Sequence, residues 1–259
     1  MIGVIPAAGS GTRMHPFTKA TPKELFPIER KAVIDHVVDS LHDCCGVNKI
    51  FVIVGAQKGA IIDHLGNGEE INKELRIAYL YQEKRKGLAH AIYQAKDWIN
   101  EDFIVHVGDS LIYPKSELKK MVKVHNELKP FATILAPRVS DPTHYGVLKI
   151  DKDNNIIDTI EKPTIEEAQP FKSGNEYVVN MGVYVFSPKF FQYVEETPKG
   201  IKGEYQVPDV IKTALKRKEK VIAVPTTGKY ANIGNWESAE EVQEFFRNIK
   251  KMKKSEMLK

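Results

Sequence analysis

Apolar and polar positions alternate along the first half of the chain in a way that predicts strands and helices in turn. Short apolar, β-branched runs predict buried strands at 2–6, 49–55, 75–81 and 102–109. Apolar residues recurring every three or four positions predict amphipathic helices at 32–45, 87–99 and 116–128. This alternation of strands and helices favours an α/β fold with a parallel, doubly wound sheet.

The pattern changes after Pro130, where apolar runs are joined by turn residues instead of helices. Strands are predicted at 131–137, 145–150, 156–163 and 177–186, with a turn at 151–155. We expect this part to form antiparallel structure laid onto the first half. A helix at 206–218, a strand at 220–225 and a charged helix beginning near Ser238 complete the chain.

No linker is evident between these parts, so we expect one domain over 1–259. Within it we distinguish a first part at 1–130, a second part at 131–235 and a C-terminal helix at 236–259. The chain has 259 residues, of which 42% are hydrophobic and 28% charged, as in ordinary globular proteins. That length is compatible with a single large core.

Charge and cysteine content exclude several classes of protein. The formal net charge is +4, and much of the surplus lies in 247–259, so we expect no nucleic-acid surface. Cys44 and Cys45 are adjacent, which disfavours a disulfide between them and favours a reducing compartment. No apolar run approaches the roughly 18 residues of a membrane span, so we expect a cytoplasmic protein without membrane contact.

The first strand is followed by five small residues, 7–11, and then by Thr12 and Arg13. Without bulky side chains, the backbone N–H groups of such a loop can face an anion at close range, and a guanidinium adds a forked donor for phosphate. A P-loop is excluded because no Gly-Lys-Ser/Thr follows. A dinucleotide fingerprint would require glycine where Met14 stands. The structural alternative is a plain glycine turn with a surface arginine.

A second cation, Lys23, lies on a short stiff segment between Pro22 and Pro27. Thr21 and Glu24 have capping-box spacing, but Pro27 limits a helix to about one turn. Rigid placement suits stabilisation of phosphate charge. Taken alone, Lys23 would be an unremarkable surface lysine.

The stretch IPAAGSGTRMHPFTKATPKELFPI (5–28) resembles the signature of sugar-1-phosphate nucleotidyltransferases. It is most similar to UTP–glucose-1-phosphate uridylyltransferases, with the dTTP-using thymidylyltransferases next, and the resemblance runs to about Phe246. It implies a Rossmann-like, mostly parallel sheet that mainly binds the nucleotide, in 1–130, with an antiparallel portion that mainly binds the sugar, in 131–235. It further implies a nucleoside triphosphate and a sugar 1-phosphate as substrates, Mg²⁺ as cofactor, and frequent assembly into homo-oligomers.

On the nucleotide side, the resemblance assigns binding to Ala7, Ala8, Gly9, Gly11, Thr12, Arg13, Gln82 and Gly87. The Gln82 amide both donates and accepts, so it suits the edge of uracil or thymine. Gly87 would let the base approach the backbone, although a glycine that opens the next helix explains it equally well.

Asp109 follows a buried strand, where ligands bind in open α/β sheets, and the resemblance makes it a Mg²⁺ ligand. A turn-forming aspartate is the alternative. The family's second carboxylate is missing, because Asn232 stands at that position, two residues before Gly234. A neutral amide would hold Mg²⁺ more weakly, which keeps a noncatalytic nucleotide-sugar-binding homologue open.

On the sugar side, the resemblance places Gly146, Glu161, Lys162, Asn180 and Gly182 around the hexose phosphate. Alternating charge on a solvated strand is the alternative for Glu161 and Lys162. The implied catalytic set is Arg13 for the departing pyrophosphate, Lys23 for the transferred group, Lys162 for the sugar phosphate, and Asp109 for the metal. The presence of all four favours an active enzyme. A nicotinamide-dependent oxidoreductase is a rival that Met14 disfavours.

Overall fold

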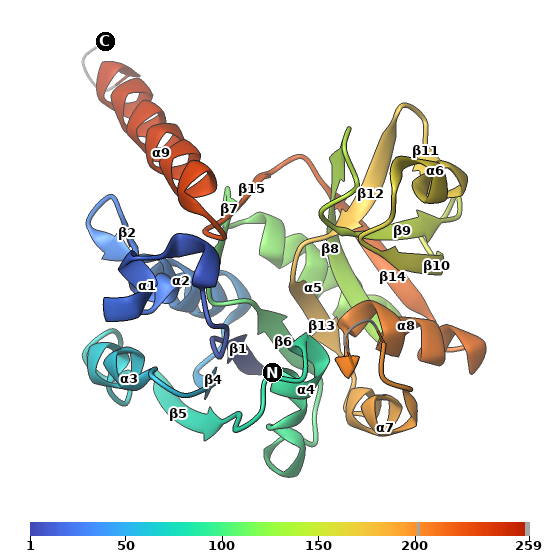
Figure 1. The fold of residues 1–259 in the computed structure, drawn as a ribbon, viewed down its shortest axis with the longest axis horizontal. Helices are drawn as coiled ribbons and strands as arrows, with labels where there is room; N and C mark the ends of the chain where they lie inside the picture. The colour runs from blue at the N-terminus through green and yellow to red at the C-terminus, as the bar shows by residue number, and fades with distance from the viewer. Residues whose placement is uncertain (201–202, 257–259) are drawn as a thin grey trace.

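The computed structural model describes residues 1–200 and 203–256. A twisted sheet of 11 strands runs through the whole fold, with the order β10-β9-β12-β8-β13-β6-β1-β4-β5; β11 adds to β12 and β14 adds to β8 (Figure 1). Helices pack on it, as the apolar stripes of the sequence require. The predicted α/β class is confirmed.

The first half supplies the parallel part of the sheet. Its strands are β1 (Ile2–Pro6), β4 (Lys49–Val54), β5 (Arg76–Tyr81) and β6 (Phe103–His106), paired in parallel register. Its longer helices are α2 (Val33–Cys45), α3 (Gly59–Leu65), α4 (Leu88–Tyr93) and α5 (Glu117–Leu128). The helix predicted over 87–99 is too long. The chain leaves α4 after Tyr93 and makes a 3-10 turn at Lys96–Trp98, which buries both Ala95 and Ile99.

The second half supplies mainly antiparallel strands. These are β8 (Ala132–Val139), β9 (Gly146–Ile150), β10 (Ile156–Glu161), β11 (Lys172–Ser173), β12 (Glu176–Asn180), β13 (Val183–Phe186) and β14 (Val221–Thr226). The single strand predicted over 177–186 is wrong. Gly182 takes a left-handed φ of 85°, which ends β12 and redirects the chain into β13. The split lets β13 pair antiparallel with β6 on one side and β8 on the other.

Most of the remaining elements are short. Helices α6 (Ile165–Ala168), α7 (Lys189–Glu196) and α8 (Val207–Lys216) belong to the second half, and α1 (Phe17–Ala20) lies beside the glycine loop. Short 3-10 helices occur at Thr12–Met14, Lys23–Leu25 and Gln169–Phe171. Two small ladders pair β2 (Pro27–Ile28) with β3 (Lys31–Ala32) and β7 (Ser110–Tyr113) with β15 (Lys229–Asn232).

The C-terminal helix α9 (Trp236–Glu256) returns to the first half of the chain and then extends away from the body (Figure 1). Its first turns bury Ala239 and Val242 against Met14 and Ile28. The Gln243 amide donates to the Pro27 carbonyl at 3.2 Å. None of the helices in the described part of the chain is both long and apolar enough to cross a bilayer.

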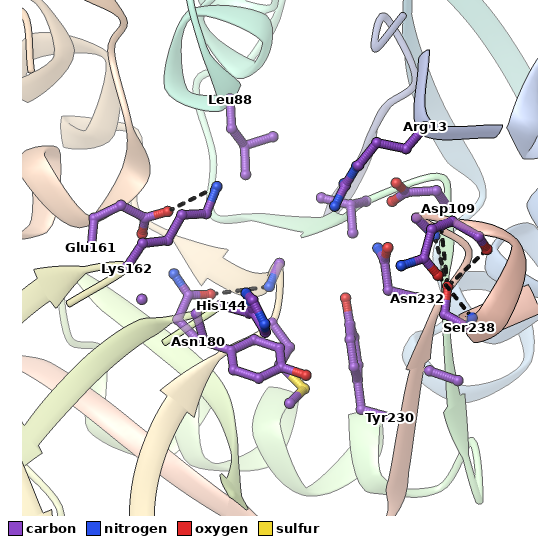
Figure 2. Close-up of a pocket in the computed structure, with 18 of the residues that line it drawn as sticks. Arg13, Leu88, Asp109, His144, Glu161, Lys162, Asn180, Tyr230, Asn232 and Ser238 are labelled. Carbon is purple, nitrogen blue, oxygen red and sulfur yellow. Dashed lines mark hydrogen bonds and ion pairs between the residues drawn. The ribbon is translucent and has the colours of Figure 1, made fainter. Parts of the chain in front are cut away.

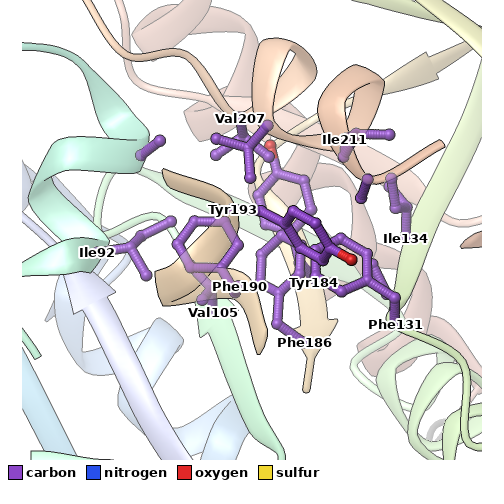
Figure 3. Packing of buried hydrophobic residues seen from close by; sticks show 14 of the residues in the cluster. Ile92, Val105, Phe131, Ile134, Tyr184, Phe186, Phe190, Tyr193, Val207 and Ile211 are labelled. Atoms are coloured by element: carbon purple, nitrogen blue, oxygen red, sulfur yellow. The ribbon is translucent and has the colours of Figure 1, made fainter. Parts of the chain in front are cut away.

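Aromatic side chains fill the core between β13 and the helices of the second half (Figure 3). The rings of Phe186 and Phe190 have centroids 4.4 Å apart, and Phe103 stacks on Phe191 at 5.1 Å. Because Phe103 comes from β6 and Phe186 from β13, this cluster joins the two halves of the sheet.

Candidate active site

The glycine loop after β1 is held by backbone hydrogen bonds. The Ala7 N–H donates to the Ile53 carbonyl at 2.8 Å, so Ala7 continues the sheet and its N–H is not available to a ligand. Gly11 has a left-handed φ of 66°, and a Cβ there would lie 2.9 Å from the Thr18 methyl group. Thr18 also donates its hydroxyl to the Gly11 carbonyl at 2.8 Å. Gly9 and Ser10 therefore form the exposed crest of a fixed loop.

A cavity of about 310 Å³, which we call pocket A, lies beside this crest. Its walls include six of the residues that the resemblance assigns to nucleotide binding or to catalysis: Ala8, Gly9, Lys23, Gln82, Gly87 and Asp109. Ala7, Gly11 and Thr12 lie outside the described walls of pocket A. They instead fix the conformation of the loop, because the Ala7 N–H and the Gly11 and Thr12 carbonyls form backbone hydrogen bonds.

Lys23 and Asp109 form an ion pair at the bottom of the site, with the Lys23 ammonium donating to Asp109 Oδ2. Burial lowers the pKa of Lys23, but the charges of Asp109 and Glu24 outweigh it and the pKa is raised. Burial raises the pKa of Asp109, yet Lys23 and the amide of Asn232 bring it below its ordinary value. Both groups are thus charged at neutral pH.

Glu24 does not cap a helix, contrary to the capping-box spacing with Thr21, because the 3-10 turn Lys23–Leu25 has no side-chain cap. Its carboxylate instead accepts a hydrogen bond from Lys58 Nζ at 2.6 Å, and the two side chains are only 2% and 6% exposed. Burial raises the pKa of Glu24 against the opposing effects of Lys58 and Lys23. Glu24 lines pocket A beside Lys23. Sequence reasoning missed this pair because Lys58 follows a different strand.

Gln82 follows β5 directly and is 3% exposed. Its amide nitrogen lies 2.9 Å from His90 Nδ1 and 3.4 Å from the Gly87 carbonyl, so neighbours in α4 orient it. Gly87 precedes α4 with a φ of 97°, and a Cβ there would lie 2.5 Å from the Tyr205 carbonyl oxygen. The fold therefore requires glycine at this position for packing and for the helix start. Close approach of a base to Gly87 stays a prediction.

A larger cavity of about 660 Å³, pocket B, adjoins pocket A, and Leu88, Val107 and Asp109 line both. Figure 2 shows Glu161 and Lys162 on one side of it, facing Arg13 and Asp109 on the other. Arg13 lines pocket B and not pocket A. The guanidinium of the glycine loop thus faces the sugar side of the predicted site.

Three of the predicted sugar-binding residues meet at the ends of neighbouring strands. A Cβ on Gly146 would lie 2.9 Å from Glu161 Oε2 and 3.6 Å from Asn180 Nδ2, so both side chains converge on the Gly146 backbone. Asn180 Oδ1 accepts from the Gly182 N–H at 3.0 Å, which fixes the amide (Figure 2). Burial raises the pKa of Glu161, although Lys162 opposes the shift. These groups form a polar wall suited to hydroxyls.

Lys162 stands at the mouth of pocket B with 65% of its side chain exposed and its Nζ 3.9 Å from Glu161. Its φ of 45° is left-handed, which is uncommon for a residue other than glycine. A hydrogen bond from the Lys162 N–H to the Tyr145 carbonyl, 2.9 Å long, maintains this conformation. Backbone strain of this kind is often found at functional positions.

Asn232 reaches Asp109 through the ladder between β15 and β7, which the sequence analysis did not predict. In that ladder Asn232 is opposite Ser110, and the Ile233 N–H donates to the Asp109 carbonyl at 2.7 Å. A Cβ on Gly234 would lie 2.6 Å from Asn232 Oδ1 and 3.3 Å from Arg13 Nη2. The structure therefore brings Arg13, Asp109 and Asn232 together, as the expected site requires.

The oxygen ligands that Asp109 and Asn232 offer, one carboxylate and one amide, are of the kind that Mg²⁺ binds. Mg²⁺ takes one or two carboxylates and completes its shell with water and substrate phosphates. Within the described ranges, no three His, Cys, Asp or Glu side chains form a metal cluster of their own. Asn232 would contribute an amide in place of a second charge.

The tyrosine Tyr230 is a further wall of pocket B that the sequence analysis did not identify. Its ring rises from β15 beside Asn232 (Figure 2). Burial raises the pKa of its hydroxyl, and the nearby Asp109 charge adds to the shift. The position follows from the β7–β15 pairing, so only knowledge of that ladder would have identified it.

Several known proteins are similar to this chain. The family model described as "Nucleotidyl transferase" matches residues 2–249. The putative UTP–glucose-1-phosphate uridylyltransferase of Methanocaldococcus jannaschii is 34% identical over 258 residues, covering 90% of this chain and 88% of that protein. The bifunctional protein GlmU of Methanococcus vannielii is 29% identical over 96% of this chain, which spans only 56% of that relative.

Among solved structures, a UDP-glucose pyrophosphorylase complexed with UDP-glucose superposes with a TM-score of 0.82 at 28% identity, covering 95% of this chain and 98% of that one. The family model spans nearly the whole chain and includes the glycine loop, Lys23, Asp109 and Lys162. This chain therefore belongs to the nucleotidyl transferase family.

Proposed function

We propose that the protein transfers the uridylyl group of UTP to glucose 1-phosphate, giving UDP-glucose and pyrophosphate. The observation that carries the proposal is the junction of pockets A and B at Asp109. One pocket presents the glycine loop, Lys23 and Gln82, and the other presents Glu161, Asn180 and Lys162. The names of the uridylyltransferase and pyrophosphorylase relatives support UTP and glucose 1-phosphate as the pair.

In this reaction a phosphate oxygen of the sugar phosphate attacks the α-phosphorus of UTP in line. The new P–O bond forms as the bond to the β-phosphate oxygen breaks, and pyrophosphate leaves with the bonding pair. The attacking oxygen is already an anion, so no general base is needed. Catalysis then comes from positioning and charge neutralisation.

Charged side chains in both pockets would position and neutralise the substrate phosphates. Lys162 binds the sugar phosphate at the mouth of pocket B, and Arg13 neutralises phosphate charge across from it. Lys23, held by Asp109 and next to Glu24, stabilises charge on the α-phosphate of the transferred uridylyl group. Mg²⁺ bound at Asp109 and Asn232 would supply further neutralisation of the substrate phosphates.

A pyrophosphate-release panel tests the proposal. UTP, dTTP, CTP, ATP and GTP are each paired with several hexose 1-phosphates in the presence of Mg²⁺. We expect the highest kcat/KM for UTP with glucose 1-phosphate. A maximum with dTTP would make the protein a thymidylyltransferase. Binding of UDP-glucose with no pyrophosphate release from any pair would make it a noncatalytic homologue.

Replacing Asn232 by aspartate should restore a second negative charge beside Asp109. We expect the Mg²⁺ concentration for half-maximal activity to fall about tenfold. The matched control is Asn235→Asp, because Asn235 also lines pocket B and its side-chain oxygen caps α9 by accepting from the Ser238 N–H, a role that aspartate retains. Unchanged metal dependence in Asn232→Asp, or an equal change in both variants, would contradict the assignment of Asn232.

A further inference from the structure

The glycine loop has a second cavity that the proposed reaction does not use. This cavity of about 170 Å³, pocket C, shares Gly9, Ser10 and Arg85 with pocket A. Its other walls come from 18–22, around α1, and from 56–58, after β4. The backbone that borders pocket A therefore also borders a separate space next to it.

The described walls of pocket C carry three cations, Lys19, Lys58 and Arg85, and no aspartate or glutamate. Lys19 is exposed and makes no ion pair within residues 1–200 and 203–256. Arg85 donates through Nε to the Ala8 carbonyl at 3.0 Å, and its two Nη groups have no hydrogen-bond partner in the same ranges. The Lys19 ammonium and the Arg85 Nη groups can therefore both donate hydrogen bonds to a ligand.

Lys58 distinguishes this cavity from a chance group of surface lysines. Its side chain is 6% exposed, and its Nζ donates to Glu24, which itself lines pocket A. An ammonium group has three N–H donors, so the bond to Glu24 leaves two. Glu24 compensates the charge of Lys58, so Lys58 adds buried N–H donors to the wall, while Lys19 and Arg85 add the positive charge that favours a negatively charged occupant.

We propose that pocket C binds a phosphate-class anion, orthophosphate or a phosphate group of similar size. Arginine provides a forked donor for phosphate oxygens, and the hydroxyls of Thr18 and Thr21 add neutral polar groups. The volume is about five to six times that of a liquid water molecule, which admits one small polyatomic anion and no nucleotide. The site does not depend on which nucleotide pocket A accepts.

Orthophosphate binding, measured by equilibrium dialysis at constant ionic strength, tests the site without any turnover. The key variant is Lys19→Gln, because Lys19 is exposed and its loss should not affect folding. The matched control is Lys84→Gln, an exposed lysine next to Arg85 that lies outside the described walls. We expect Kd for orthophosphate to rise about three- to fivefold in Lys19→Gln and less than twofold in the control.

Two further variants separate pocket C from the predicted catalytic pockets. The pair Glu24→Gln with Lys58→Met removes both buried charges together, so the fold keeps its charge balance; we expect about a tenfold loss of orthophosphate affinity. Lys162→Gln removes the exposed cation of pocket B and should leave the affinity unchanged. Circular dichroism confirms that each variant is folded.

Competition identifies the source of the phosphate. Displacement of orthophosphate by UTP but not by UMP would mean that the terminal phosphate of a nucleotide in pocket A enters pocket C, whereas no displacement by either would mean a free anion.

The proposal is overturned if no saturable binding occurs up to about 20 mM. It is also overturned if Lys19→Gln and Lys84→Gln weaken binding equally, or if Lys162→Gln abolishes it. Failure of the pyrophosphate panel would leave these results unaffected.

Discussion

Asp109→Asn should lower kcat about 10²- to 10³-fold, because it removes the carboxylate at the junction of the two pockets. Asp109 accepts the hydrogen bond that holds Lys23, and in the proposed reaction its carboxylate would also be the charged ligand of Mg²⁺. The substitution nearly preserves volume, so the fold should remain. Steady-state pyrophosphate release, measured over a range of Mg²⁺ concentrations, gives kcat and the metal dependence together.

The control for this variant is Asp97→Asn, which changes an exposed aspartate in the 3-10 turn Lys96–Trp98. Its activity should match that of the unmodified protein. If Asp109→Asn keeps about half of its turnover or more, with a normal melting temperature, Asp109 is not the group on which the chemistry depends.

Lys58→Met should lower the free energy of unfolding by about 3 to 5 kcal/mol, because it leaves the buried Glu24 carboxylate without its partner. Adding Glu24→Gln should recover most of that loss, since both charges are then gone. Urea unfolding of the two single variants and the pair forms a double-mutant cycle that isolates the interaction.

An ion pair with an exposed lysine provides the comparison. Lys120 and Glu117 also lie 2.6 Å apart, but the Lys120 side chain is 60% exposed, and the buried Glu117 carboxylate also accepts from the Thr226 hydroxyl. Lys120→Met should therefore cost less than about 1 kcal/mol. If Lys58→Met and Lys120→Met lower the free energy of unfolding equally, burial does not strengthen the dependence of Glu24 on Lys58.

The parallel half of the fold could be predicted from the sequence because its signals are local. Strands β1, β4, β5 and β6 are continuous apolar runs, and α2 and α5 have regular apolar stripes. The β7–β15 ladder could not be predicted. Its strands have four residues each and come from distant parts of the chain, so no periodicity connects them.

In the candidate site, too, the features with a local sequence signal could be predicted, and those that depend on distant contacts could not. The chemistry of Arg13, Lys23, Asp109 and Lys162 is legible in the sequence, and the structure gathers these residues around pockets A and B. The sequence does not show which of the two pockets Arg13 lines, because that depends on how Gly234 packs against the guanidinium. Gly87 is similar, since its need for glycine arises from Tyr205, far away in the chain.

The position of β13 limits how the molecule can admit its substrates. β13 is hydrogen-bonded to β6 in the first half and to β8 in the second, and its aromatic residues pack across the same boundary. A hinge between the halves would break this ladder and separate the aromatic rings that pack across it. Entry and release therefore fall to the loops at the strand ends, and the spacing between the two substrates is set by a rigid frame.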